Sequence, residues 1–171
     1  MNKFLRLTAL AATAALAFTA TEAAAAPVNA TTNATAHARI LRPLTLTSTQ
    51  NLDLGDIVLS GAAPFTATVS ITKAGVFSCG AAVTCSGTHQ VAIYNVSGTK
   101  SQPVTIAAGN VTLSDAAGDK LTLTPDFNTT LNLTNSGSPG DNFNVGGSIT
   151  VADTTPDGVY TGTFAVTADY Q

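Results

Sequence analysis

The residues of this chain that could perform catalysis are few and lack the context of an active site. A nucleophilic triad needs a Ser or Cys, a His that takes its proton and a carboxylate that orients the His. The only histidines are His37 and His89, and neither lies in a recognisable catalytic motif. The sequence also lacks Gly-x-Ser-x-Gly, His-Glu-x-x-His and a phosphate-binding loop. We therefore expect no catalytic residue and no cofactor, and a secreted hydrolase is the weakest of the possible functions.

The carboxylates have the context of turn residues. Every acidic residue after Glu22 is an Asp, and most of them lie beside Gly or near Pro, where Asp favours turns. Paired carboxylates for glycoside cleavage are therefore disfavoured. Asp53 and Asp56 are close enough in the sequence to offer oxygen ligands to calcium, but no EF-hand or repeat spacing surrounds them. We predict no metal site, and calcium binding by this pair stays open.

Cys79 and Cys85 are the only cysteines. In an oxidising compartment, a pair separated by five residues predicts a disulfide. We expect it to staple a local hairpin or loop. A redox or metal role is disfavoured because the pair does not form Cys-x-x-Cys.

The composition restricts the kind of partner. Charged residues make up 10% of the chain, compared with about 25% in an average globular protein, so Thr, Ser, Asn and Gly must cover the surface. The net charge is -3 and the Lys and Arg residues are scattered singly, which argues against nucleic acid. Sugar-binding surfaces usually use aromatic platforms, and this chain has no Trp and only 3 Tyr.

The first residues predict export. Residues 1–25 combine Lys3 and Arg6, an apolar run over 7–20 and small residues at 23–26, which is the pattern of a secretory signal peptide. The apolar run is too short for a membrane span, so we expect none in the mature chain. The predicted organisation is a signal peptide over 1–25, an N-terminal extension over 26–38 and one domain over 39–171.

The secondary structure that the sequence predicts is β-strand, so strands must position any functional site. Alternation of apolar and polar residues is clearest over 65–72, where Phe65, Ala67, Val69 and Ile71 share one face. Further strands are predicted over 39–48, 52–59, 91–96, 104–106, 110–114, 121–124 and 130–134, and over 143–151 through a bulge at Gly146-Gly147. Many short strands joined by Gly, Pro and Asp turns predict an all-β, immunoglobulin-like sandwich.

The two ends of the mature chain have complementary patterns. Residues 157–171 predict a long strand that ends the chain and lies at or near a sheet edge, where unpaired backbone groups recruit partners. Small apolar residues share one face of the N-terminal extension, which could form an extended strand. These residues are Val28, Ala30, Ala34, Ala36 and Ala38.

The C-terminal segment resembles the signature of chaperone–usher fimbrial subunits. It has a penultimate Tyr170, a Gly158 fourteen positions from the end and alternating apolar residues between them. The residues of this strand are Gly158, Tyr160, Gly162, Phe164, Val166, Ala168 and Tyr170. The resemblance implies that a periplasmic chaperone reads this strand, and that the N-terminal extension of the next subunit later fills the groove beside it.

Other stretches resemble a family of secreted bacterial domains of unknown function, similar in appearance to spore-coat-U-type domains. The matching stretches are 36–44, 92–98, 145–151 and 158–170. They extend over most of the predicted mature chain.

Together these patterns predict a non-enzymatic structural subunit of a surface filament or coat, of the fimbria or pilus kind, assembled by strand addition. The expected partners are copies of the chain or related subunits, a periplasmic chaperone and an outer-membrane usher. The protein would pass through the periplasm to the cell surface or an extracellular filament. The alternative is a self-contained secreted or periplasmic β-sandwich that binds a glycan or protein ligand.

Overall fold

The computed structural model describes residues 28, 32 and 34–171. The predicted signal peptide and Ala30 lie outside the described residues. The chain divides into two units between Ala38 and Arg39.

Residues 39–171 form an all-β sandwich, which confirms the predicted fold class. The strands are β1 (Thr45–Gln50), β2 (Asp56–Leu59), β3 (Thr66–Ile71), β4 (Phe77–Ser78), β5 (Val83–Ser86), β6 (Ala92–Ser97), β7 (Pro103–Ala108), β8 (Val111–Ser114), β9 (Lys120–Asp126), β10 (Thr130–Asn132), β11 (Asp141–Ala152) and β12 (Val166–Tyr170). Among the described residues, no helix is long and apolar enough to cross a membrane.

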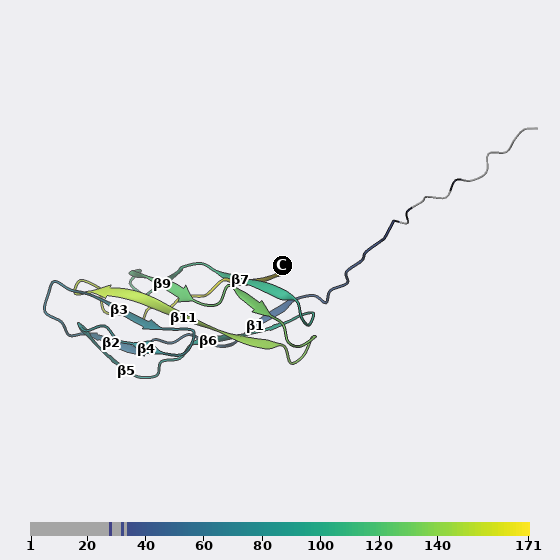
Figure 1. Cartoon of the computed structure of the whole chain (residues 1–171). Helices are drawn as coiled ribbons and strands as arrows, with labels where there is room; N and C mark the ends of the chain where they lie inside the picture. Colours follow the sequence, from purple (N-terminus) through teal and green to yellow (C-terminus); the bar gives the residue numbers. More distant parts are fainter. Residues whose placement is uncertain (1–27, 29–31, 33) are drawn as a thin grey trace, which may run out of the picture. The chain divides into compact units, whose positions relative to one another are not determined.

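The largest sheet is organised around β11, the longest strand. Its order is β1-β6-β11-β3-β4, with β9 also paired to β11 and β8 paired to β9. A second sheet has the order β10-β7-β12, and β2 and β5 form a separate pair. Figure 1 shows β11 running through the length of the sandwich, with β1 and β6 at one end and β3, β2 and β5 at the other.

β11 changes partners at the predicted Gly146-Gly147 position. Val145 is the last residue paired with β6, opposite Ala92, and Gly146 is the first paired with β9, opposite Asp126. A Cβ added at Gly146 would lie 2.2 Å from the backbone oxygen of Ile71 on β3. Only glycine lets the backbones approach this closely, so this residue allows one strand to serve both ends of the sheet.

Two clusters of buried side chains correspond to these two ends. The first includes Tyr94, Val96, Ile106 and Val145 and lies between the β6–β11 part of the large sheet and the β7 sheet. The second joins β3, β9 and the end of β11, and its members are Ala67, Val69, Val83, Val111, Leu123, Ile149 and Val151. Leu52 and Phe164 are half-buried and pack against both clusters, so they connect the two parts of the core.

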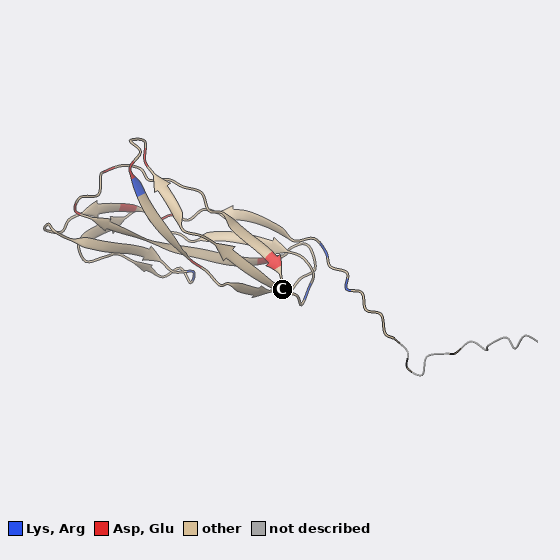
Figure 2. Cartoon of the chain, turned by 90° about the horizontal axis from the view of Figure 1, so that it is seen from above, with Lys and Arg blue, Asp and Glu red and all other residues tan. Residues whose placement is uncertain are grey.

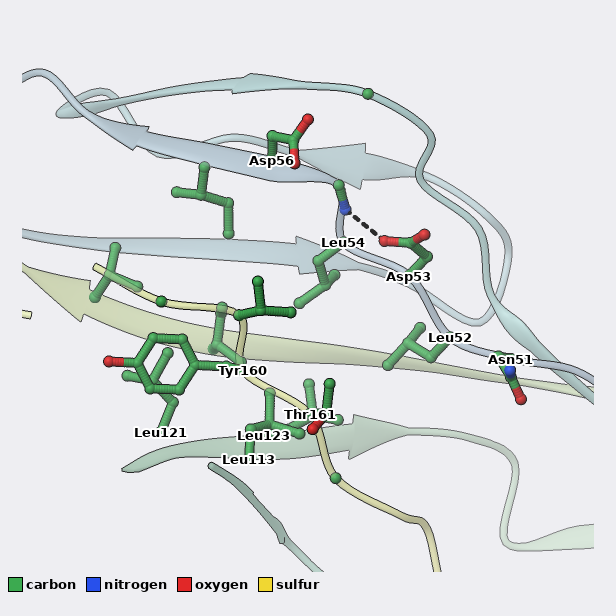
Figure 3. Close-up of a pocket in the computed structure, with 18 of the residues that line it drawn as sticks. Asn51, Leu52, Asp53, Leu54, Asp56, Leu113, Leu121, Leu123, Tyr160 and Thr161 are labelled. Carbon is green, nitrogen blue, oxygen red and sulfur yellow. Dashed lines mark hydrogen bonds between the residues drawn. The ribbon is translucent and has the colours of Figure 1, made fainter. Parts of the chain in front are cut away.

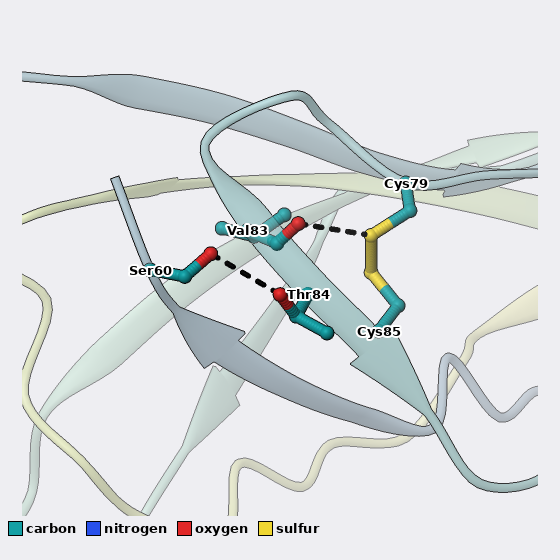
Figure 4. Close-up of a disulfide and its surroundings, with 5 residues drawn as sticks. All are labelled: Ser60, Cys79, Val83, Thr84 and Cys85. Atoms are coloured by element: carbon teal, nitrogen blue, oxygen red, sulfur yellow. Dashed lines mark hydrogen bonds between the residues drawn. A yellow bond between two sulfur atoms is a disulfide. The ribbon is translucent and has the colours of Figure 1, made fainter. Parts of the chain in front are cut away.

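The predicted disulfide between Cys79 and Cys85 is present. It closes the local loop between these residues, as predicted, but not a hairpin, because the strands beside it do not pair with each other. Cys79 follows β4, which pairs with β3 in the large sheet, whereas Cys85 lies in β5, which pairs with β2. The disulfide therefore ties the β2–β5 pair to the large sheet (Figure 4).

Two early strands are shorter than predicted. The strand predicted over 39–48 begins only at Thr45, because Pro43 cannot donate to a ladder. The strand predicted over 52–59 is reduced to β2, because Gly55 has a φ of 73° and turns the chain. The extension predicted as a possible strand has none in its described residues, and Val28, Ala34, Ala36 and Ala38 are exposed.

We predict that Gly146→Ala lowers the free energy of unfolding by about 1–3 kcal/mol, because the new methyl group overlaps the backbone of β3. The matched control is Gly109→Ala, since a Cβ at Gly109 meets no atom within 4 Å. Urea unfolding of the two variants measures the difference. Equal stabilities would contradict the tight packing of β11 against β3.

Candidate functional site

The candidate site is a groove with a volume of about 1370 Å³. One wall is β2 with the residues that lead into it, and the other is the segment 155–164. The side chains of its floor are apolar and come from β8, β9 and β11. They are Leu113, Leu121, Leu123, Ile149 and Val151. Figure 3 shows Leu54 and Asp56 on one side of this space and Tyr160 and Leu121 on the other.

The backbone of each wall has unpaired groups. β2 pairs with β5 along one edge, and no other strand among residues 34–171 pairs with it. In the opposite wall, Thr161 exchanges two hydrogen bonds with Ser114 of β8, at 2.8 and 2.9 Å. Successive residues of an extended segment direct their backbone groups to opposite sides. Tyr160 and Gly162 therefore direct theirs away from β8.

β12 follows this wall in the chain and has a free edge of its own. The Gln171 N–H donates to the Pro103 carbonyl at 3.1 Å, so odd-numbered residues of the strand direct their backbone groups toward β7. β7 shows the matching pattern. Ile106 lies opposite Ala168, but its N–H donates to the Thr129 carbonyl on the other side of β7 and not to β12. The backbone groups of Val166, Ala168 and Tyr170 thus lie on the open edge, where no described strand pairs with them.

The long C-terminal strand predicted over 157–171 is wrong in its first half. Thr161 pairs with β8 in the large sheet, whereas Val166–Tyr170 pairs with β7 in the other sheet. The chain must cross between the layers at 162–165, so these residues cannot pair with one neighbouring strand.

The side chains of this segment nevertheless include the predicted half-buried residues with exposed residues between them. The half-buried residues are Tyr160, Phe164, Val166, Ala168 and Tyr170, and the residues between them are exposed. Gly162 packs against β8, where a Cβ would lie 2.7 Å from the Thr112 carbonyl oxygen, and Gly158 lies beside Asp115.

Large apolar side chains are exposed around the groove and in the residues that precede β1. Val159 is 81% exposed and Val58 is 56% exposed, and both line the groove. Val28 and Ile40 are 95% and 92% exposed. The sequence prediction did not identify the β2 wall or the leucines of the floor as parts of a site. Their alternating pattern indicated strands but not a shared cavity.

The other predicted site residues are not brought together for chemistry. The Asp53 carboxylate accepts a hydrogen bond from the Gly55 N–H at 2.8 Å, which makes it a turn residue. His89 stacks on Phe77 with ring centroids 3.9 Å apart. Among the described residues, no group of three or more His, Cys, Asp and Glu could hold a metal ion.

Tyr170 connects the end of the chain to the start of the sandwich. Its hydroxyl accepts a hydrogen bond from the Thr99 N–H at 2.6 Å and donates one to the Arg42 carbonyl at 2.8 Å. Arg42 also donates its N–H to Thr99 Oγ1 at 2.7 Å. The penultimate tyrosine therefore fixes the point at which the N-terminal residues leave the domain.

We predict that Tyr170→Phe lowers the free energy of unfolding by about 1–3 kcal/mol, because a backbone donor and acceptor lose their partner. Tyr94→Phe is the control, since Tyr94 is a buried tyrosine whose ring stacks on Phe143. Thermal unfolding compares the two variants. A smaller loss for Tyr170→Phe than for Tyr94→Phe would contradict the anchoring role.

The chain was compared with protein families, curated proteins and solved structures. Residues 44–170 match the family described as Domain of unknown function (DUF4402). No curated protein and no solved structure matched. The match begins beside β1 and ends at Tyr170, so it includes both walls and the floor of the groove. The chain belongs to the DUF4402 family.

Proposed function

We propose that this protein is a non-enzymatic structural subunit that is exported and assembles by strand addition into a surface filament or coat. The observation that carries the proposal is the groove between β2 and 155–164. It combines an apolar floor with walls whose backbone groups are unpaired within the described residues. Partners of this kind of groove are extended segments that add a strand to a sheet.

An added strand would satisfy both features of the groove. Its backbone would pair with the unpaired groups of the wall at Tyr160 and Gly162, and alternate side chains would cover the leucines of the floor. Burial of a Val or Leu side chain contributes about 1.5–3 kcal/mol, so covering Val58 and Val159 alone would favour binding. Exposed sheet edges of this kind otherwise promote uncontrolled association.

The proposed occupant is the N-terminal extension of another copy. Its residues 34–38, and Arg39 and Ile40 directly after it, are exposed and form no strand, so they are available to pair. The small side chains of Ala34, Ala36 and Ala38 share one face in an extended chain, and Val28 and Ile40 place a larger apolar group near each end. Related subunits could supply the same kind of segment.

The export partners follow from the same proposal. A groove with an apolar floor would need protection before assembly, and a periplasmic chaperone that lends a strand would provide it. An outer-membrane usher would then exchange that strand for the extension of the next subunit. The resemblance of the Gly158 to Tyr170 segment to the fimbrial signature supports this route.

A self-contained binding module is the second candidate function. Two clusters of buried side chains and the disulfide favour a domain that folds without a partner. In that case, the groove would bind a glycan or a segment of another protein, and the purified mature protein would remain monomeric.

Deletion of residues 26–38 tests the proposed function. We predict that the mature chain forms polymers and that the deletion abolishes them, because the added strand is lost while the sandwich is retained. Size-exclusion chromatography with light scattering measures the assembly. Circular dichroism checks that the shortened chain is folded, with a periplasmic chaperone present if it is required.

A matched control replaces Asn29, Thr31 and Thr35 by Ser, on the opposite face of the extension. These changes should leave assembly intact. Polymers that persist unchanged after the deletion would contradict strand addition, and a monomeric mature chain would favour the binding module.

A further inference from the structure

We infer that the acidic rim of the groove recognises the basic residues of a neighbouring copy's extension and sets its register. This inference rests on the proposed function. The extension enters with even-numbered side chains on the apolar floor, and His37 and Arg39 lie along the rim. The occupant is therefore residues 28–40 of a second copy in one defined orientation.

The rim of the groove is acidic. The charged residues that line it are Asp53, Asp56 and Asp157, and all three are exposed. Among the described residues, no Lys or Arg lines the groove. In Figure 2, several acidic segments lie at the end of the sandwich away from the C-terminus.

These carboxylates are not neutralised by ion pairs. The one salt bridge within residues 34–171 joins Lys73 to Asp126, at 3.3 Å, and neither residue lines the groove. Asp115 and Asp119 add negative charge beside Tyr160 of the groove wall. Lys120 is the basic residue at the adjacent end of β9, where it lies opposite Ser114.

The environment of Tyr160 reports the same negative field. Its pKa is raised by burial first, and then by the charges of Asp115, Asp119 and Asp157. Three carboxylates therefore lie near Tyr160 at the groove wall.

The extension has the opposite charge. No Asp or Glu occurs between Glu22 and Asp53, and the charged or titratable residues of this stretch are His37, Arg39 and Arg42. The Arg42 backbone is held by Tyr170 in its own sandwich, so His37 within the extension and Arg39 directly after it are the basic residues that can reach a neighbouring groove. Complementary charges of this kind steer association and fix register more than they raise affinity.

Even-numbered and odd-numbered side chains lie on opposite faces of an extended chain, which assigns the two faces of the extension. Val28, Ala34, Ala36, Ala38 and Ile40 are even-numbered and lie on one face of an extended chain. The two basic residues are odd-numbered, so they lie on the other face. When the apolar face covers the floor, the basic face turns to the solvent side of the groove, where the exposed rim carboxylates lie.

The test is a charge exchange in the full mature chain. Arg39→Glu should slow assembly about fivefold at about 0.05 M salt, and the Asp56→Lys/Asp157→Lys variant should slow it similarly. The hydrogen bond that holds the turn at Asp53 is accepted by the Asp53 carboxylate itself, so these changes leave it in place. The chain that carries all three changes should assemble within about twofold of the original rate, because the opposite charges face each other again.

The control is Lys100→Glu, which changes the net charge as Arg39→Glu does but lies outside the extension and the groove. Light scattering follows assembly, and circular dichroism confirms the fold of each variant. At about 0.5 M salt, the differences among the folded variants should shrink to less than twofold.

The outcomes separate the two proposals. If the original chain assembles through residues 26–38 and Arg39→Glu behaves like Lys100→Glu, the charge-set register is wrong and strand addition stands. Failure of the triple variant to recover, while it remains folded, also overturns the register. If the original chain does not assemble at all, strand addition and the register both fail.

Discussion

Backbone pairing by β11 holds the two ends of the sandwich together. Its first half pairs with β6, and its second half pairs with both β3 and β9. The change of partners occurs at Gly146, where the β3 backbone leaves no room for a side chain. Both core clusters include residues of this strand, so the floor of the groove and the packing of β7 depend on the same element.

The groove follows from how the remaining strands cover that floor. β2 is held by β5 and, through the disulfide, by the large sheet, while 155–164 is held by the pairing of Thr161 with Ser114. These two segments lie on either side of Leu121 and Leu123 without pairing to each other. The result is an apolar floor with unpaired backbone beside it, which is the arrangement that favours an added strand.

The low charge of the chain gives its few charges more influence on recognition. Only 10% of the residues are charged. Against this low charge, two features are prominent: the three aspartates on one rim, and the stretch from 23 to 52 without any carboxylate. Exposed ion pairs contribute about 0.2–1 kcal/mol each, which is small beside the burial of several apolar side chains. In the proposed assembly, apolar burial and backbone pairing supply the affinity, and charge selects the register.

The sequence by itself determined the fold class, the disulfide and the faces of most strands. Alternation over 65–72 and 160–170 predicted which side chains are buried, because side chains of an extended chain point to opposite sides whatever its partners are. The sequence could not show where a strand ends. Residues 160–170 keep one alternation, yet Thr161 pairs with β8 and Val166–Tyr170 pairs with β7.

Only the tertiary structure decided that Asp56, Leu123 and Tyr160 line one groove, and that Cys79–Cys85 joins two sheets instead of closing a hairpin. The physical reason is that strand pairing joins residues far apart in the chain. Local periodicity contains no information about which edges meet and which remain open.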